Sequence, residues 1–320
     1  MAPAFIITVD TEGDNLWSRP RAVTTRNAAW LPAFQQLAEQ FGFRPTWLVN
    51  WEMAHAPVVV EFLRAVLARG SGEVGLHLHG WDTPPLAPLT RDDSQHHPFL
   101  AEYPEPLQRA KLERLAGVLE EKFQQPLRSH RAGRWGLDGR IVQWLREHGF
   151  TVDCSVCPGV DWRSTLGDPD GGGGPDYRGA PREPYFLDEH DVRKPAVNPK
   201  PDALLEVPMT IGRPRANVTG FVVEAFSKRH YWFRPNGRNG AAMRERVDEA
   251  VAEGRAHLMF MLHSSELMPG GSPTFSSAAA IDRLNDDLAA LFAHARARGC
   301  RGRTLGEFAA EWRAVATRAV

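Results

Sequence analysis

The sequence predicts an α/β protein in which parallel strands alternate with helical crossovers, arranged as a distorted (β/α) barrel. Two observations support this prediction. Along the chain of 320 residues, short apolar runs alternate with segments whose apolar residues recur at helical spacing. No Pro- or Ser-rich linker divides the alternation into halves, so we expect a single domain over residues 1–320.

Each predicted element follows from its local pattern. The first helix carries Trp30, Phe34, Leu37 and Phe41 on one helical face. The predicted strands are short apolar runs, which in chain order span 5–9, 46–49, 73–78, 151–155, 204–209 and 257–262. The other predicted helices lie around residues 59–67, 112–119, 141–145, 243–251 and 281–292. The glycine- and proline-containing stretch at about 158–201 is too long for a plain connection and predicts a loop-rich excursion over one barrel end.

The composition narrows the classes of function. The chain has 38 Lys and Arg against 39 Asp and Glu, a formal net charge of -1, which gives no overall attraction for polyanions. We therefore expect a small or neutral partner and no nucleic acid. No apolar run approaches the roughly 18 residues of a membrane span, and the N-terminus leads directly into a predicted strand, so we expect a cytoplasmic protein without a membrane span. No pattern in the sequence indicates an oligomeric state.

Cys154 and Cys157 have the CxxC spacing of redox and zinc sites. A redox pair belongs at a helix N-terminus, which lowers the pKa of a thiol, whereas this pair ends a predicted strand and runs into Pro158. We therefore expect two buried small residues without a redox role.

Polar and ionisable residues gather at the carboxyl ends of the predicted strands. They are Asp10, Glu12, Asp14, His77, His79, Arg131, Asp153 and His263. In a parallel α/β fold these ends meet at one face, where such folds place their sites. The sequence therefore predicts one pocket built from segments far apart in the chain.

His77 and His79 alternate along a predicted strand, so their imidazoles point to the same side. Two histidines and one carboxylate leave open positions on a divalent ion, and Zn²⁺ suits such ligands. Asp10 and Glu12 are the nearby carboxylates. The alternative for either histidine alone is a hydrogen-bonded core residue.

His263 ends an almost wholly apolar strand, where a buried ionisable group must be hydrogen-bonded or take part in chemistry. Asp153 ends another strand and is predicted as its partner, which makes His263 a candidate general acid. The alternative is an Asp–His pair that only ties two strands together. Arg131 is predicted to hold Asp10 with a two-pronged hydrogen bond and to keep it ionised.

In this order, the segments resemble the motifs of the polysaccharide deacetylase family, also called the NodB-homology or carbohydrate esterase family 4 group. The matching segments are Thr8–Glu12, Glu73–His77, Arg131–Arg134, Asp153–Pro158 with Trp162 after it, and Leu262–His263. The resemblance covers most of the chain. It implies a distorted (β/α) barrel that removes N- or O-acetyl groups from a carbohydrate with the help of a divalent metal. Residues 77–85 and 131–136 look like a branch found near surface-polysaccharide biosynthesis.

The resemblance also implies roles for single residues. Asp10 would remove a proton from water, His263 would protonate the leaving group, Arg131 would orient Asp10, and Asp153 would tune His263. The metal and a backbone N–H would share the oxyanion.

Two departures from the family pattern affect the metal ligands. Thr11 replaces the usual second aspartate, so the carboxylate must come from Glu12, Asp14 or Asp10. Trp81 stands four residues beyond His77, so the second imidazole must be His79. We expect Glu12, His77 and His79 to hold the metal.

Three tryptophans, Trp81, Trp135 and Trp162, lie next to the chemical motifs. Sugar rings pack on aromatic planes, so these residues are candidates for substrate binding, with core packing as the alternative for each.

Two other functions remain open. One is a metal-free glycoside hydrolase, which would need a pair of carboxylic acids such as Asp10 and Asp153. The other is a metal-free pseudoenzyme or carbohydrate-binding protein on the same barrel.

Overall fold

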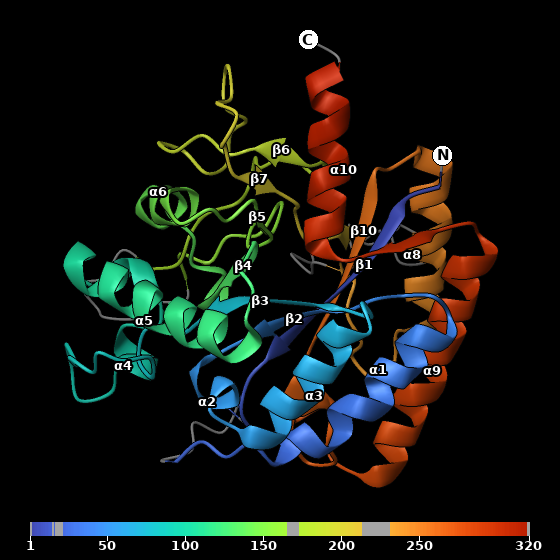
Figure 1. Ribbon diagram of the computed structural model, residues 1–320. Coiled ribbons are helices and arrows are strands. Elements are labelled where there is room, and N and C mark those ends of the chain that lie inside the picture. Colours follow the sequence, from blue (N-terminus) through green and yellow to red (C-terminus); the bar gives the residue numbers. More distant parts are fainter. Residues whose placement is uncertain (1, 15, 17–21, 165–172, 213–230, 319–320) are drawn as a thin grey trace.

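The structure is a computed structural model that describes residues 2–14, 16, 22–164, 173–212 and 231–318. In this part of the chain, nine strands form one curled sheet with helices packed around it (Figure 1). Neighbouring strands follow the order β10-β1-β2-β3-β4-β5-β7-β6, and β11 also pairs with β1. All pairs are parallel except β6 with β7. The predicted distorted (β/α) barrel is confirmed.

The strands of the sheet are β1 (Ala4–Thr11), β2 (Thr46–Val49), β3 (Glu73–Leu78), β4 (Ser129–Ala132), β5 (Val152–Asp153), β6 (Tyr185–Phe186), β7 (Leu205–Glu206), β10 (His257–His263) and β11 (Arg301–Arg303). A separate ribbon contains β8 (Ile211–Gly212) and β9 (Tyr231–Trp232). Beside this ribbon, the Met259 N–H donates to Thr210 Oγ1 at 2.8 Å and the Met261 N–H to the Phe233 carbonyl at 3.3 Å. These bonds attach the ribbon to β10.

The longer helices are α1 (Leu31–Gln40), α3 (Pro57–Ala68), α5 (Glu105–Phe123), α6 (Gly139–Glu147), α8 (Gly240–Glu253), α9 (Ala278–Ala297) and α10 (Leu305–Arg318). Short helical turns are α2 (Trp51–Ala54), α4 (Asp93–His96), η2 (Arg26–Trp30), η3 (Leu100–Glu102), η4 (Gly133–Trp135) and η5 (Ser264–Leu267). No helix in the described residues is long and apolar enough to cross a lipid bilayer.

The two faces of the sheet build two apolar cores, because successive strand residues point to opposite sides. Phe5, Ile7 and Val9 belong to the core between the sheet and the surrounding helices. Ile6 belongs to the second core, inside the curl, together with Leu48 from β2. Helix α10 adds apolar side chains to this inner core and lies at the end of the molecule where both chain termini are found (Figure 1).

The same alternation sorts the polar residues. Asp10 pairs in register with His263, and His77 pairs with Arg131. These residues point to the inner face. His130 comes one residue before Arg131 and pairs with Asp153, so both lie on the outer face.

Several predicted elements match the structure closely, and others were missed. The strands at 46–49 and 73–78 are observed at those residues. The missed elements include α10, β11 and the β8–β9 ribbon. In the predicted excursion at 158–201, the described residues contain β6 and two isolated bridges, and residues 165–172 lie outside the described part. Cys154 and Cys157 are buried free thiols, as predicted, and burial raises the pKa of both well above the usual value.

Candidate active site and metal centre

A cavity of about 340 Å³ lies at the carboxyl ends of the strands. Asp10, Glu12, His77, His79 and His263 line it. Four of the eight other lining residues are aromatic, among them the three tryptophans predicted from the sequence, and two are arginines. One pocket therefore brings together residues from both ends of the chain.

Three of the lining residues form a candidate metal centre. Nε2 of His77 lies 3.7 Å and Nε2 of His79 lies 3.4 Å from Oε2 of Glu12. All three side chains are buried, and their ligand atoms lie within 4.8 Å of one another. Asp14 is engaged elsewhere, because its carboxylate accepts hydrogen bonds from Thr24 and from the Asn27 N–H. Among the carboxylates left open by the sequence, this geometry favours Glu12.

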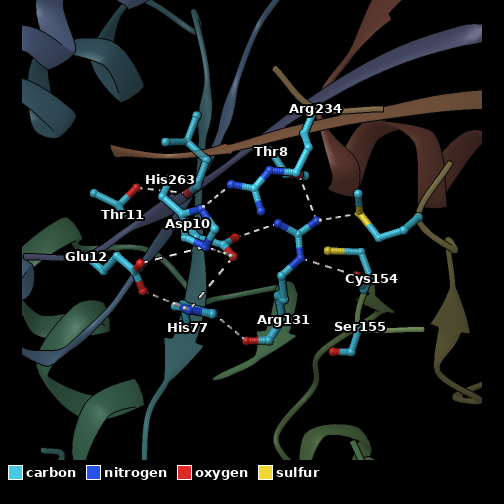
Figure 2. A network of polar contacts seen from close by, with 12 residues as sticks. Thr8, Asp10, Thr11, Glu12, His77, Arg131, Cys154, Ser155, Arg234 and His263 are labelled. Carbon is cyan, nitrogen blue, oxygen red and sulfur yellow. Dashed lines mark hydrogen bonds and ion pairs between the residues drawn. The ribbon is translucent and has the colours of Figure 1, made fainter. Parts of the chain in front are cut away.

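The hydrogen bonding of the two imidazoles fits a metal. Nδ1 of His77 lies 2.9 Å from the Arg131 carbonyl oxygen, which can only accept (Figure 2). The proton is therefore on Nδ1, and Nε2 directs its lone pair toward Glu12. Nδ1 of His79 is buried without a hydrogen-bond partner in the described residues and lies 3.7 Å from Asp82. The donor set of two nitrogens and one carboxylate suits a divalent ion with open coordination positions.

Residues that the sequence analysis missed fix the backbone of Glu12. The Glu12 N–H donates to Ser264 Oγ at 3.0 Å, and the same hydroxyl donates to the Glu12 carbonyl at 2.8 Å. The Asn27 side-chain amide donates to that carbonyl at 2.7 Å. The carboxylate thus projects from a backbone held by η2 and η5.

Arg131 holds Asp10, but with one hydrogen bond and not with the predicted two-pronged contact. Its Nη1 donates to Oδ1 of Asp10 at 2.5 Å, while its Nη2 donates to Thr8 Oγ1 at 2.8 Å (Figure 2). The other oxygen, Oδ2, faces Nε2 of His77 at 4.0 Å and Nε2 of His263 at 3.9 Å. Burial alone would raise the pKa of Asp10, but the nearby cationic groups, Arg131 foremost, lower it to about 2. Asp10 is therefore an ionised base whose Oδ2 is not bound by Arg131 and faces the two imidazoles.

His263 is partnered differently from the prediction. Its Nε2 faces the pocket, 3.8 Å from Oε1 of Glu12. On the opposite side of the ring, Nδ1 lies 3.2 Å from Oε2 of Glu266 and 3.2 Å from Nη2 of Arg234. Sequence reasoning missed both partners, although Glu266 follows His263 by three residues.

The predicted pairing of Asp153 with His263 is wrong. Asp153 lies on the outer face, where its Oδ2 is 2.5 Å from Nδ1 of His130. It also accepts hydrogen bonds from the Ser155 N–H at 2.8 Å and the Ser155 hydroxyl at 3.0 Å. The reason is the side-chain alternation of strands, which turns Asp153 away from the pocket.

The tryptophans do not all have the same surroundings. Trp81 stacks on His79 with ring centroids 4.4 Å apart, so one of its faces is covered. Trp135 and Trp162 both contact Trp232, at 5.4 and 5.9 Å between centroids. We call Trp135, Trp162 and Trp232 the tryptophan wall. Trp232 lies in the two-residue strand β9, which has no periodic signal in the sequence.

The turn that carries Trp135 is conformationally unusual. Arg134 and Trp135 have φ values of 56° and 63°, in the left-handed region that non-glycine residues seldom adopt. The Tyr177 hydroxyl donates to the Trp135 carbonyl at 2.6 Å and helps to hold this turn. Strained backbone of this kind is typical of sites where a side chain must be aimed.

Comparisons with known proteins bear on the fold. No protein-family model matches the sequence, and no curated protein matches it. A solved structure assigned as a glycoside hydrolase/deacetylase from Parabacteroides distasonis is similar, with a TM-score of 0.63 and 16% identity over 98% of this chain and 72% of that chain. A GH57-type branching enzyme from Pyrococcus horikoshii has a TM-score of 0.56 and 9% identity, covering 98% of this chain and 71% of its own. The chain shares its curled (β/α)-barrel fold with these two structures, and this is the fold that the sequence predicts.

Proposed function

We propose that this protein is a metal-dependent hydrolase that removes an N- or O-linked acetyl group from a carbohydrate. The observation that carries the proposal is the arrangement of the pocket. The candidate ligands Glu12, His77 and His79 lie beside the ionised Asp10, and the imidazole of His263 faces the same space.

Glu12, His77 and His79 would hold the ion, which supplies Lewis-acid polarisation of the acyl carbonyl when bound; Zn²⁺ suits this ligand set. Oδ2 of Asp10 accepts the proton of the attacking water, because Arg131 occupies the other oxygen and keeps the carboxylate ionised. Nε2 of His263 donates a proton to the leaving nitrogen or oxygen as its bond to the acyl carbon breaks. Water thus ends as the hydroxyl of acetic acid, and the sugar leaves as an amine or alcohol.

The tryptophan wall supports a carbohydrate as the substrate. Trp135 and Trp162 line the same cavity as the candidate metal ligands. Trp232 contacts the rings of both. Aromatic planes next to a few polar groups are typical of sites that bind sugar rings.

The structure gives less support to a two-carboxylate glycoside hydrolase, although a branching enzyme shares the fold. Such an enzyme needs one carboxylic acid whose pKa is raised so that it can donate a proton. Asp153 lies outside the pocket, on the outer face of the sheet. Despite burial, Arg131 and the neighbouring histidines lower the pKa of Asp10, and the histidines lower that of Glu12, so neither of these carboxylates is suited to be the general acid.

Metal content tests the proposal directly. The purified wild-type protein, incubated with Zn²⁺ and desalted, should retain one equivalent by elemental analysis and hydrolyse acetylated sugars. The double variant His77→Ala, His79→Ala should lose both properties, while the matched control His190→Ala, at an exposed histidine, should keep both. One retained equivalent in the double variant would overturn the ligand assignment. A wild-type protein that binds acetylated oligosaccharides without metal or hydrolysis would instead be a carbohydrate-binding protein.

A further inference from the structure

A buried ion pair lies behind His263, on the side of its ring away from the candidate metal ligands. Glu266 is 2% exposed and belongs to η5, the turn that follows β10. Its Oε2 accepts the backbone N–H of His263 at 2.8 Å and lies 3.2 Å from Nδ1 of the ring. One carboxylate oxygen therefore contacts both the main chain and the side chain of the same histidine.

Arg234 completes this arrangement from a distant part of the chain. Its Nη2 donates to Oε1 of Glu266 at 2.8 Å and approaches Nδ1 of His263 at 3.2 Å. Figure 2 shows its guanidinium beside the His263 ring. Burial would raise the pKa of Glu266, but Arg234 and then His263 lower it to about 2. Glu266 is therefore an ionised group that can only accept hydrogen bonds.

Capping of a helical turn does not account for this pair. A cap needs only the bond from Glu266 to the His263 N–H, which is present. It requires neither a second contact to the imidazole nor an arginine on the pocket wall. Burying the charge of Glu266 costs free energy, and Arg234 offsets that cost at the place where the carboxylate meets the ring.

We propose that Glu266, supported by Arg234, is the positioning residue for His263 in the deacetylation reaction. This inference rests on the proposed function. The carboxylate accepts a hydrogen bond from the Nδ1–H group and thereby leaves Nε2 as the nitrogen that faces the substrate. In the transfer step the Nε2–H bond breaks and the proton joins the leaving atom, which receives the electron pair of the broken acyl bond. The Nδ1 proton stays on the ring, hydrogen-bonded to Glu266.

Substrates with different leaving groups test the proposal. p-Nitrophenolate leaves without protonation, whereas a sugar amine or alkoxide needs a proton. Glu266→Gln should lower kcat for an acetylated sugar by on the order of 10²-fold, the lower end of what a general acid contributes. Its kcat for p-nitrophenyl acetate should fall by less than about 3-fold, and KM and metal content should not change, because the acid is not required for that ester.

Two further variants complete the kinetic test. Arg234→Lys keeps the positive charge and should show the same pattern to a smaller degree. Glu253→Gln, at an exposed position near the end of α8, is the matched control and should affect neither substrate. Equal losses on both substrates in Glu266→Gln, or loss of metal, would show a structural role and overturn the proposal.

A spectroscopic measurement separates this inference from the proposed function. Nitrogen-15 NMR of the His263 ring should show the proton on Nδ1 in the wild-type protein and a changed Nδ1 signal in Glu266→Gln. If the wild-type protein hydrolyses neither substrate, the proposed function fails, but this signal still reports whether Glu266 holds the Nδ1 proton. A ring that carries its proton on Nε2 alone in the wild type would overturn the positioning role.

Discussion

Two buried polar clusters lie on opposite faces of the same sheet. The pocket cluster consists of Asp10, Glu12, His77, His79, Arg131 and His263, and the outer cluster consists of His130, Asp153 and Glu206. His130 and Arg131 are consecutive residues of β4, yet each belongs to a different cluster. The pocket cluster borders a cavity, whereas every residue of the outer cluster is at most 1% exposed. The same residue types at strand ends can therefore serve catalysis or packing, and the face decides which.

The two clusters also differ in their charge balance. In the pocket, Arg131 and the neighbouring histidines overcome the effect of burial and lower the pKa of Asp10 and Glu12. In the outer cluster, burial and the charge of Asp153 raise the pKa of Glu206 well above its usual value. His130 supports the charge of Asp153, whose pKa is lowered although burial opposes this. In the outer cluster, the pKa values of the two neighbouring carboxyls are therefore shifted in opposite directions.

The largest expected effect is on kcat, which should depend on the pocket cluster. Asp10→Asn should lower kcat for an acetylated sugar by about 10³-fold, within the range for loss of a general base, because an amide cannot accept the proton of water. Metal content should be retained, since Asp10 is not among the expected ligands. The measurement is steady-state kinetics with elemental analysis, and Asp282→Asn at an exposed position of α9 is the control. Wild-type kcat in Asp10→Asn would remove Asp10 from the proposed mechanism.

The next effect concerns stability. Asp153→Asn should lower the free energy of unfolding by on the order of 3 kcal/mol, because it removes the buried carboxylate that lies 2.5 Å from Nδ1 of His130. The kcat of the folded variant should stay within about 3-fold of the wild type, since Asp153 does not line the cavity. Urea unfolding and kinetics below the melting temperature measure the two quantities. A selective loss of kcat with unchanged stability would show that the outer cluster takes part in the reaction.

Asp153 also shows where sequence reasoning reaches its limit. The barrel was predictable because apolar runs alternate with helical patterns, and most of the pocket residues were predictable because they stand at the carboxyl ends of those runs. Strand β5 has only two residues, too few for a pattern to reveal its inner face. Both its place at the end of a strand and the family resemblance predicted a role for Asp153 beside His263, and the register of the sheet contradicts that role.

Other missed features had different causes. Helix α10 was missed although Leu305, Phe308, Ala309 and Trp312 recur at helical spacing, so its signal was present in the sequence. Glu266 stands in a short turn and Arg234 follows a two-residue strand, and neither segment has a periodic pattern. Such side chains become candidates only once the neighbours of His263 are known in space.

A smaller effect tests whether Glu206, in the outer cluster, keeps its proton in the folded protein. A glutamate in an unfolded chain has a pKa near 4.3, and the pKa of Glu206 is raised in the folded protein. At a pH between these two pKa values, the folded state therefore holds a proton that the unfolded state has released. This contribution to stability is fully present below the unfolded pKa and is lost as pH rises through the folded pKa. Glu206→Gln removes the titration. The free energy of unfolding of Glu206→Gln, relative to that of the wild type, should therefore increase with pH. The increase should be about 1.4 kcal/mol for each unit by which folding raises the pKa of Glu206.

Urea unfolding of Glu206→Gln and wild type between pH 4 and 9 measures this difference, with Glu253→Gln as the control at an exposed glutamate. A constant difference across the pH range would mean that the carboxyl does not keep its proton in the folded state. The outer cluster would then resemble the pocket cluster, with all of its acids ionised.

The smallest expected effect concerns substrate binding on the inner face. Trp162→Ala should raise KM for an acetylated oligosaccharide by about 5- to 10-fold, because an aromatic contact is worth about 1 kcal/mol, and should leave kcat nearly unchanged. Trp162 lines the cavity with Trp135, whereas Trp51 packs against His55 and Arg114 elsewhere in the fold. Trp51→Ala is therefore the matched control and should leave KM unchanged. If both variants alter KM equally, the effect comes from the fold as a whole. If Trp162→Ala lowers kcat and leaves KM unchanged, the tryptophan wall supports the turn around Arg134 and does not bind sugar.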